Sequence, residues 1–65
     1  MKYPLITLEA ARVNAHFTQK DAARKLGICK ETLSSYEKGK TYPTMDMAQK
    51  MAELYCFPID FIYFY

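Results

Sequence analysis

The sequence of 65 residues predicts an all-α domain of five short helices. Apolar residues recur at helical spacing along most of the chain, and threonines and glycines stand where such helices would begin and end. No segment is a convincing β-strand. We expect one domain, residues 1–65, whose small core gives it marginal stability.

The first two helices have clear boundaries. Thr7 can cap a first helix, and its apolar stripe contains Leu5, Leu8, Ala11 and Ala15. Thr18 can cap a second helix, with Asp21 three residues later as in a capping box. This helix runs to about Leu26, and Gly27 suits the left-handed position that follows a helix.

The remaining helices follow from similar signals. We expect a third helix over about 29–38, ended by Gly39, although a cysteine at its start is a poor N-cap. Thr44 can cap a fourth helix that runs to about Leu54. A fifth short helix should begin at Pro58, with Ile59, Ile62 and Tyr63 on one side.

Positive charge is concentrated in the middle of the chain. Residues 18–42 carry six basic and three acidic side chains, a net charge of +3, whereas the rest of the chain carries a net charge of −1. Such a segment is either a solvated helical face or a surface that binds phosphate. The charge pattern alone leaves both readings open.

Several classes of protein are disfavoured by composition. No apolar run approaches the length of a membrane span, and the N-terminus lacks the pattern of a signal peptide, so we expect a cytoplasmic protein without membrane association. Cys29, Cys56 and His16 are too few for a zinc site, and the cysteines are expected to be free thiols. No paired carboxylates or catalytic triad point to an enzyme, and we expect no metal, cofactor or small-molecule ligand.

The second and third helices together carry the most information. Two such helices can cross steeply when a small residue, here Ala23, lies at their contact and a glycine, here Gly27, allows positive φ in the turn. The positions expected to face the core are all apolar: Ala22, Leu26, Ile28, Leu33 and Tyr36.

The segment TQKDAARKLGICKETLSSYEKGKTYP resembles the Cro/cI-type helix-turn-helix, also called the XRE or lambda-repressor-like family. The matching positions are Thr18, Gln19, Ala23, Gly27, Ile28, Thr32, Leu33, Ser34, Tyr36, Glu37, Gly39 and Pro43. The resemblance implies a compact five-helix lambda-repressor-like DNA-binding domain whose second and third helices form the helix-turn-helix. The sequence departs from the family pattern at Ala22, Cys29 and Pro58, which lowers the expected stability.

The resemblance also implies roles on the third helix, whose first residues would meet base edges in the major groove. Lys30, Glu31 and Ser35 fall on base-reading positions, and Ser34 is a further polar candidate. Lysine can donate to guanine, glutamate can accept from cytosine N4, and serine can do either. An exposed polar helix face is the alternative, and Glu31 could simply favour the helix dipole.

Phosphate contacts are expected on both sides of that helix. The resemblance assigns one to Gln19 at the start of the second helix, where the side chain and the backbone N–H can meet a phosphate oxygen. The end of the third helix and the following loop supply further candidates, Lys38, Lys40 and Tyr42. For these three side chains, plain solvent exposure is the alternative.

Two structural roles complete the prediction. By resemblance, Glu37 pairs with Arg12 in a partly buried salt bridge, since a buried carboxylate without a partner would be costly. Family members often pair through the C-terminal end, which here is rich in aromatic residues. We expect a weak homodimer whose surface includes Phe61, Tyr63, Phe64 and Tyr65, unless this segment only covers its own domain.

The predicted function is sequence-specific binding of double-stranded DNA by a small transcriptional regulator of phage or bacterial type. Repression is the expected mode, because a domain without an effector module acts most simply by occupying an operator. The alternative is a protein-interaction module with the same fold, similar to an antitoxin or anti-repressor. Salt-dependent binding to duplex DNA separates the two.

Overall fold

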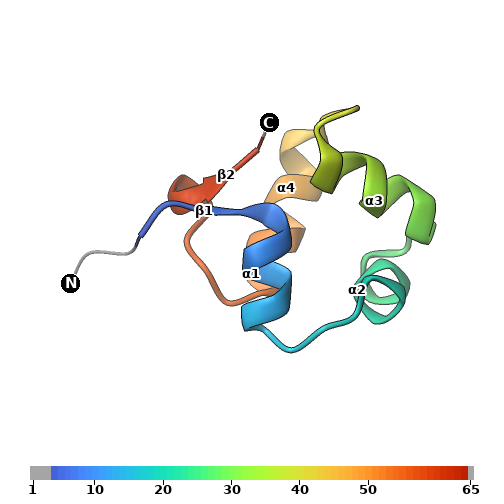
Figure 1. The fold of residues 1–65 in the computed structure, drawn as a ribbon, viewed down its shortest axis with the longest axis horizontal. Helices are drawn as coiled ribbons and strands as arrows, with labels where there is room; N and C mark the ends of the chain where they lie inside the picture. Colours follow the sequence, from blue (N-terminus) through green and yellow to red (C-terminus); the bar gives the residue numbers. More distant parts are fainter. Residues whose placement is uncertain (1–3, 65) are drawn as a thin grey trace.

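The computed structural model describes residues 4–64 and consists mainly of four helices (Figure 1). Their bounds are α1 Leu8–Asn14, α2 Gln19–Leu26, α3 Lys30–Lys38 and α4 Met45–Leu54. These bounds confirm the first four predicted helices. Connections between them are short, so each helix is held close to its neighbours in sequence.

The helix ends have the predicted chemistry. The hydroxyl groups of Thr7, Thr18 and Thr44 each accept a hydrogen bond from the backbone N–H three residues later, at 3.1–3.2 Å. Gly27 and Gly39 end α2 and α3 with φ of 75° and 77°. These residues stop each helix because the chain can turn there without the steric penalty of a side chain.

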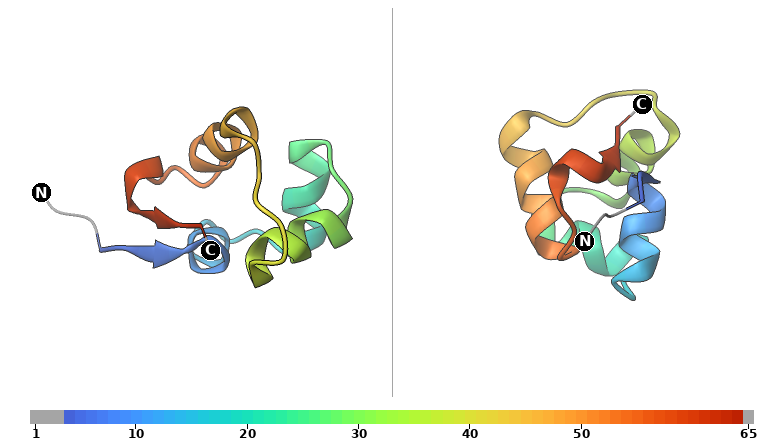
Figure 2. Two further views of the ribbon diagram at one scale, coloured as in Figure 1. Left: turned by 90° about the horizontal axis from the view of Figure 1, so that it is seen from above. Right: turned by 90° about the vertical axis from the view of Figure 1, so that its left-hand side faces the viewer.

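The prediction of an all-α fold with a fifth helix is wrong in detail. Ile59–Phe61 forms only a 3-10 turn, η1, and the chain then becomes a short strand, β2 Ile62–Tyr63. This strand lies beside β1 Ile6–Thr7 and pairs with it in parallel (Figure 2). In this pairing Ile6 lies opposite Ile62. Branched and aromatic side chains favour extended backbone, and Pro58 provides no side-chain cap for a longer helix.

The core lies where α1, α3 and α4 meet. Leu8, Leu33 and Met51 are its largest fully buried side chains, one from each of these helices. Ala22 and Ala23 are also buried, so α2 can approach closely. Leu5 was expected in the apolar stripe of the first helix, but it precedes β1 and remains 64% exposed. Its position in an extended arm, rather than a helix, turns it away from the core.

Candidate nucleic-acid interface

The α2–α3 pair forms the outer edge of the domain, and α3 runs across α2 (Figure 1). The turn between the two helices is held by a hydrogen bond from the Ile28 N–H to the Ala23 carbonyl, at 3.0 Å. Leu33 anchors α3 because its side chain is completely buried. Ile28 and Tyr36 are half-buried and pack against the same core. The predicted core-facing side of α3 is therefore confirmed.

The opposite side of α3 is polar. Lys30, Glu31 and Lys38 are exposed, and Ser34 and Ser35 are half-buried. The structure thus places the four predicted base-contacting residues at exposed or half-buried positions of one helix, whereas Leu33 and Glu37 are buried. Lys30 lies at the start of the helix, where a major-groove reader places its contacting residues.

A polar hollow of about 510 Å³ joins the start of α2 to the start of α3. Its lining residues are Glu9, Arg12, Thr18, Gln19, Lys20 and Lys30. Gln19 and Lys30, which were predicted to contact phosphate and base respectively, therefore border the same depression. Lys20 and Lys30 are the exposed basic side chains on this hollow and are suited to an anion; Arg12 is paired with Glu37, and the carboxylate of Glu9 offsets part of the positive charge.

The other predicted phosphate contacts lie at the far end of α3. Lys38 ends this helix and Lys40 follows Gly39, and both side chains are exposed. Tyr42 is 65% exposed, but it also lines a separate apolar hollow beside α4.

Arg12 and Glu37 form the predicted salt bridge, and both residues are only 8% exposed. The Arg12 Nε donates to Glu37 Oε2 at 2.7 Å, and the Nη2 lies 3.5 Å from Oε1. The Arg12 Nη1 donates to the Phe17 carbonyl at 2.8 Å. A second carboxylate, that of Glu9, lies 3.9 Å from Nη2. The guanidinium group is therefore bonded on several sides, as a buried charge requires.

Gln19 joins this ion pair, which sequence reasoning missed. Its Nε2 donates to Glu37 Oε1 at 2.8 Å. The side chain that was expected to meet a phosphate is thus bound to the carboxylate of α3. No local pattern signals this contact, because the two residues are 18 positions apart. Arg12, Gln19 and Glu37 link α1, α2 and α3 through a set of hydrogen bonds that we call the Glu37 hub.

Tyr55 lies at the end of α4 and is more buried than the residues of the Glu37 hub. It is 4% exposed, and its ring packs against Phe17 with centroids 6.2 Å apart. Among residues 4–64, its hydroxyl oxygen is the buried side-chain polar atom without a hydrogen-bond partner. Burial raises the pKa of Tyr55 to about 12, and the negative charge of Glu37 adds to this effect. Tyr55 therefore stays neutral.

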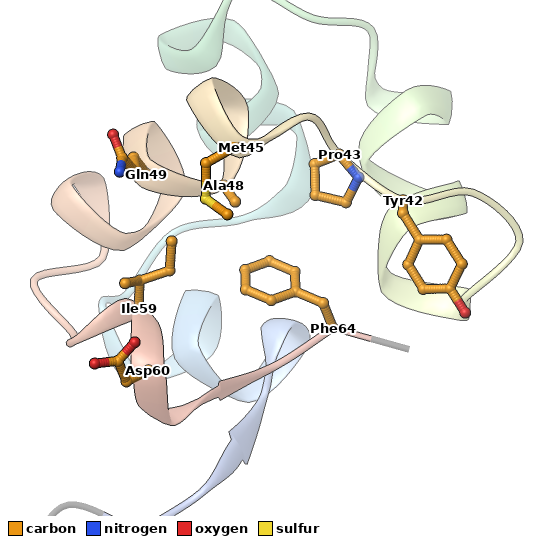
Figure 3. Close-up of a pocket in the computed structure, with 8 residues that line it drawn as sticks. All are labelled: Tyr42, Pro43, Met45, Ala48, Gln49, Ile59, Asp60 and Phe64. Atoms are coloured by element: carbon orange, nitrogen blue, oxygen red, sulfur yellow. The ribbon is translucent and has the colours of Figure 1, made fainter.

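The C-terminal segment is partly packed on the domain. Phe61 and Phe64 are half-buried, whereas Tyr63 is 51% exposed; Tyr65 lies outside the described residues. Figure 3 shows Phe64 facing Ile59, Ala48 and Met45 across a hollow of about 510 Å³. Of the predicted dimer residues, Phe64 contributes to the domain core as well as to its surface.

Within residues 4–64, no group of three or more His, Cys, Asp or Glu side chains could hold a metal ion. In the same part of the chain, no helix has both the length and the apolar character needed to cross a membrane.

Comparison with known families agrees with this geometry. The family model described as Helix-turn-helix matches residues 8–62, which include all four helices. The chain belongs to the Cro/cI-type helix-turn-helix family. Members of this family are transcriptional regulators and are not enzymes. The helix-turn-helix itself consists of α2, the turn at Gly27 and α3.

Three curated relatives match most of the chain. An uncharacterized HTH-type transcriptional regulator of Methanocaldococcus jannaschii is 36% identical over 58 residues, which cover 89% of this chain and 88% of the relative. An uncharacterized HTH-type regulator of Archaeoglobus fulgidus is 32% identical, with 83% and 76% covered. The HTH-type transcriptional regulator ImmR of Bacillus subtilis is 40% identical over 85% of this chain, but this match spans only 43% of ImmR. No solved structure gave a significant match.

Proposed function

We propose that the protein is a transcriptional regulator that binds double-stranded DNA sequence-specifically, with α3 in the major groove. The observation that carries this proposal is the division of α3 into two sides. Leu33 and Glu37 are buried, while Lys30, Glu31, Ser34 and Ser35 form the polar side. These side chains can donate to guanine or accept from cytosine. The relatives' description as HTH-type transcriptional regulators supports the same function.

The basic residues around α3 are proposed to bind the DNA backbone. Lys38 and Lys40 would contact phosphates beyond the end of α3, with Tyr42 as a further donor. The start of α2 would contact a phosphate on the other side through its backbone N–H groups. The Thr18 hydroxyl accepts from Asp21 N–H, so the N–H groups of Gln19 and Lys20 point out of the first turn as donors.

Repression is the proposed mode of regulation. A protein bound to an operator can block polymerase without contacting any other protein. We further propose a weak homodimer through the C-terminal end, including Phe61, Tyr63, Phe64 and Tyr65. The exposed Tyr63 and the apolar hollow beside Phe64 support an interface there. A two-fold axis at this end would present two α3 helices about 34 Å apart, one turn of DNA.

Salt dependence tests the DNA-binding proposal. Binding to a fluorescent duplex should weaken steeply with salt, because each neutralised phosphate releases counterions. Lys38→Met should reduce the slope of log K against log salt by about 0.9 for each bound copy. Lys50→Met on α4 is the matched control and should leave the slope unchanged. Salt-independent binding, or equal effects of the two variants, would refute the proposed placement of DNA.

The dimer has its own test. Sedimentation at high protein concentration, with and without a palindromic duplex, should show two copies on the DNA and partial association without it. A strict monomer under both conditions would refute the dimer while leaving DNA binding by a single copy possible.

A further inference from the structure

The Glu37 hub joins two surfaces that are proposed to contact different parts of DNA, one the phosphates and the other the bases. Gln19 is the first residue of α2, where a phosphate would bind, and Glu37 lies one residue before the end of α3, which would read bases. The Gln19 amide is hydrogen-bonded to one carboxylate oxygen on α3, Oε1 of Glu37. The relative position of the two DNA-contacting elements therefore depends on a specific hydrogen bond as well as on the apolar core.

Glu37 is well placed to fix that position. Its side chain is 3% exposed, and Oε2 is held by the Arg12 Nε at 2.7 Å. The Arg12 Nη1 is bonded in turn to the Phe17 carbonyl, two residues before α2 begins. The carboxylate thus has little freedom to turn, and it presents Oε1 to Gln19. A hydrogen bond to such a fixed, charged acceptor is both short and strong.

The bond also changes what Gln19 can do. One of the two Nε2–H groups is directed at Glu37, so the side chain is folded back onto α3 instead of extending freely toward solvent. Gln19 is accordingly half-buried. The backbone N–H groups of the first turn are left to meet the phosphate.

We infer that Glu37 is a positioning residue for DNA binding: through its hydrogen bond with the Gln19 side chain, it holds the phosphate-binding start of α2 at the spacing that lets α3 enter the groove. This inference rests on the proposed DNA-binding function. Glu37 itself touches no DNA. Glu37 contributes to affinity by holding the start of α2 in the geometry that it has in the DNA complex. A contact that is already ordered in the free protein loses less entropy on binding.

A double-mutant cycle tests the coupling. Gln19→Met keeps the length of the side chain and the backbone N–H but removes the amide. Glu37→Gln keeps the shape but removes the charge. Affinity for a duplex that the wild-type protein binds is measured at a temperature where every variant is folded. Each single variant should bind about tenfold more weakly, because Gln19→Met removes the hydrogen bond and Glu37→Gln leaves only a neutral acceptor in place of the charged one; the double variant should lose little more.

The control variant is Lys20→Met, at the same end of α2. Lys20 is exposed and is not bonded to Glu37. Its loss of affinity should multiply with that of Glu37→Gln, because the two act independently. If the losses at residues 19 and 37 multiply in the same way, Gln19 acts on DNA without Glu37 and the inference is wrong. A Glu37→Gln protein of lower melting temperature but wild-type affinity also overturns it.

A second measurement covers the case in which Glu37→Gln does not fold. In free Gln19→Met, ¹⁵N relaxation should show larger backbone amplitudes at residues 19 and 20 than in the wild type, with α4 unchanged. Unchanged amplitudes would mean that the hydrogen bond does not fix α2, and would overturn the inference. Failure of the wild-type protein to bind any duplex would instead refute the proposed function, and is measured first.

Discussion

Replacing Glu37 by alanine removes the acceptor that Arg12 and Gln19 share. Arg12 would keep its bond to the Phe17 carbonyl, at 2.8 Å, but the nearest remaining carboxylate, that of Glu9, is 3.9 Å away and is itself 64% exposed. The guanidinium group would therefore stay buried without a close counter-charge. Removing one partner of a buried ion pair typically costs about 3–5 kcal/mol.

That loss is large for a domain of this size. Stabilities of about 0.05–0.15 kcal/mol per residue predict about 3–10 kcal/mol for the whole chain. Each kcal/mol corresponds to about 4–8 °C in melting temperature for small domains. Glu37→Ala should therefore lower the melting temperature by at least about 12 °C, and it can unfold the protein altogether.

Thermal and urea unfolding followed by circular dichroism measure this change. Glu31→Ala is the matched control, because Glu31 is an exposed glutamate on the same helix and its loss should change stability by less than about 0.5 kcal/mol. The double variant Arg12→Met, Glu37→Leu should recover most of the lost stability, because an apolar pair has no charge to bury. A Glu37→Ala loss below about 1 kcal/mol, the range of an exposed salt bridge, would refute the buried-charge argument.

Three further substitutions test other parts of the fold. Cys29→Ser should raise the stability by about 1 kcal/mol in urea unfolding, because Cys29 is the N-cap residue of α3 and its side chain makes no capping hydrogen bond; an unchanged midpoint would contradict this. Leu33→Ala should cost about 2–5 kcal/mol, since Leu33 is fully buried, and a smaller loss would show that α3 is not anchored there. Stability should fall between pH 10 and about 12, where tyrosine ionises in the unfolded chain while Tyr55 in the folded chain stays protonated. Tyr55→Phe should remove part of that fall, and an identical pH profile would contradict the role of Tyr55.

The helices were predictable because their signals are local. Thr7, Thr18 and Thr44 each cap a helix through a bond to a residue three positions away, and Gly27 and Gly39 adopt the backbone conformation that ends a helix. The division of α3 into a buried and a polar side follows from the spacing of its own residues. The family resemblance added the Arg12–Glu37 pair, which residue spacing alone does not reveal.

The missed features are contacts between distant parts of the chain. The β1–β2 pair joins Ile6 to Ile62, and two-residue strands are too short to show an alternating pattern. Leu5 fits a helical stripe in the sequence, yet the pairing of β1 draws this segment into an extended arm. The Gln19–Glu37 bond likewise depends on how closely α2 and α3 pack. Such contacts are set by tertiary structure, which overrides local preference.

Selection of binding sites from a random pool of duplex DNA tests the central claim most directly, with Lys30→Ala selected in parallel. The account predicts an enriched site in two symmetric halves for the wild-type protein. The variant should lose its preference at one base pair in each half and should keep the remaining pattern, since a good base contact contributes about 1–3 kcal/mol of discrimination. Absence of any enriched site at low salt from a folded sample, or identical preferences for the two proteins, would contradict base reading by the start of α3.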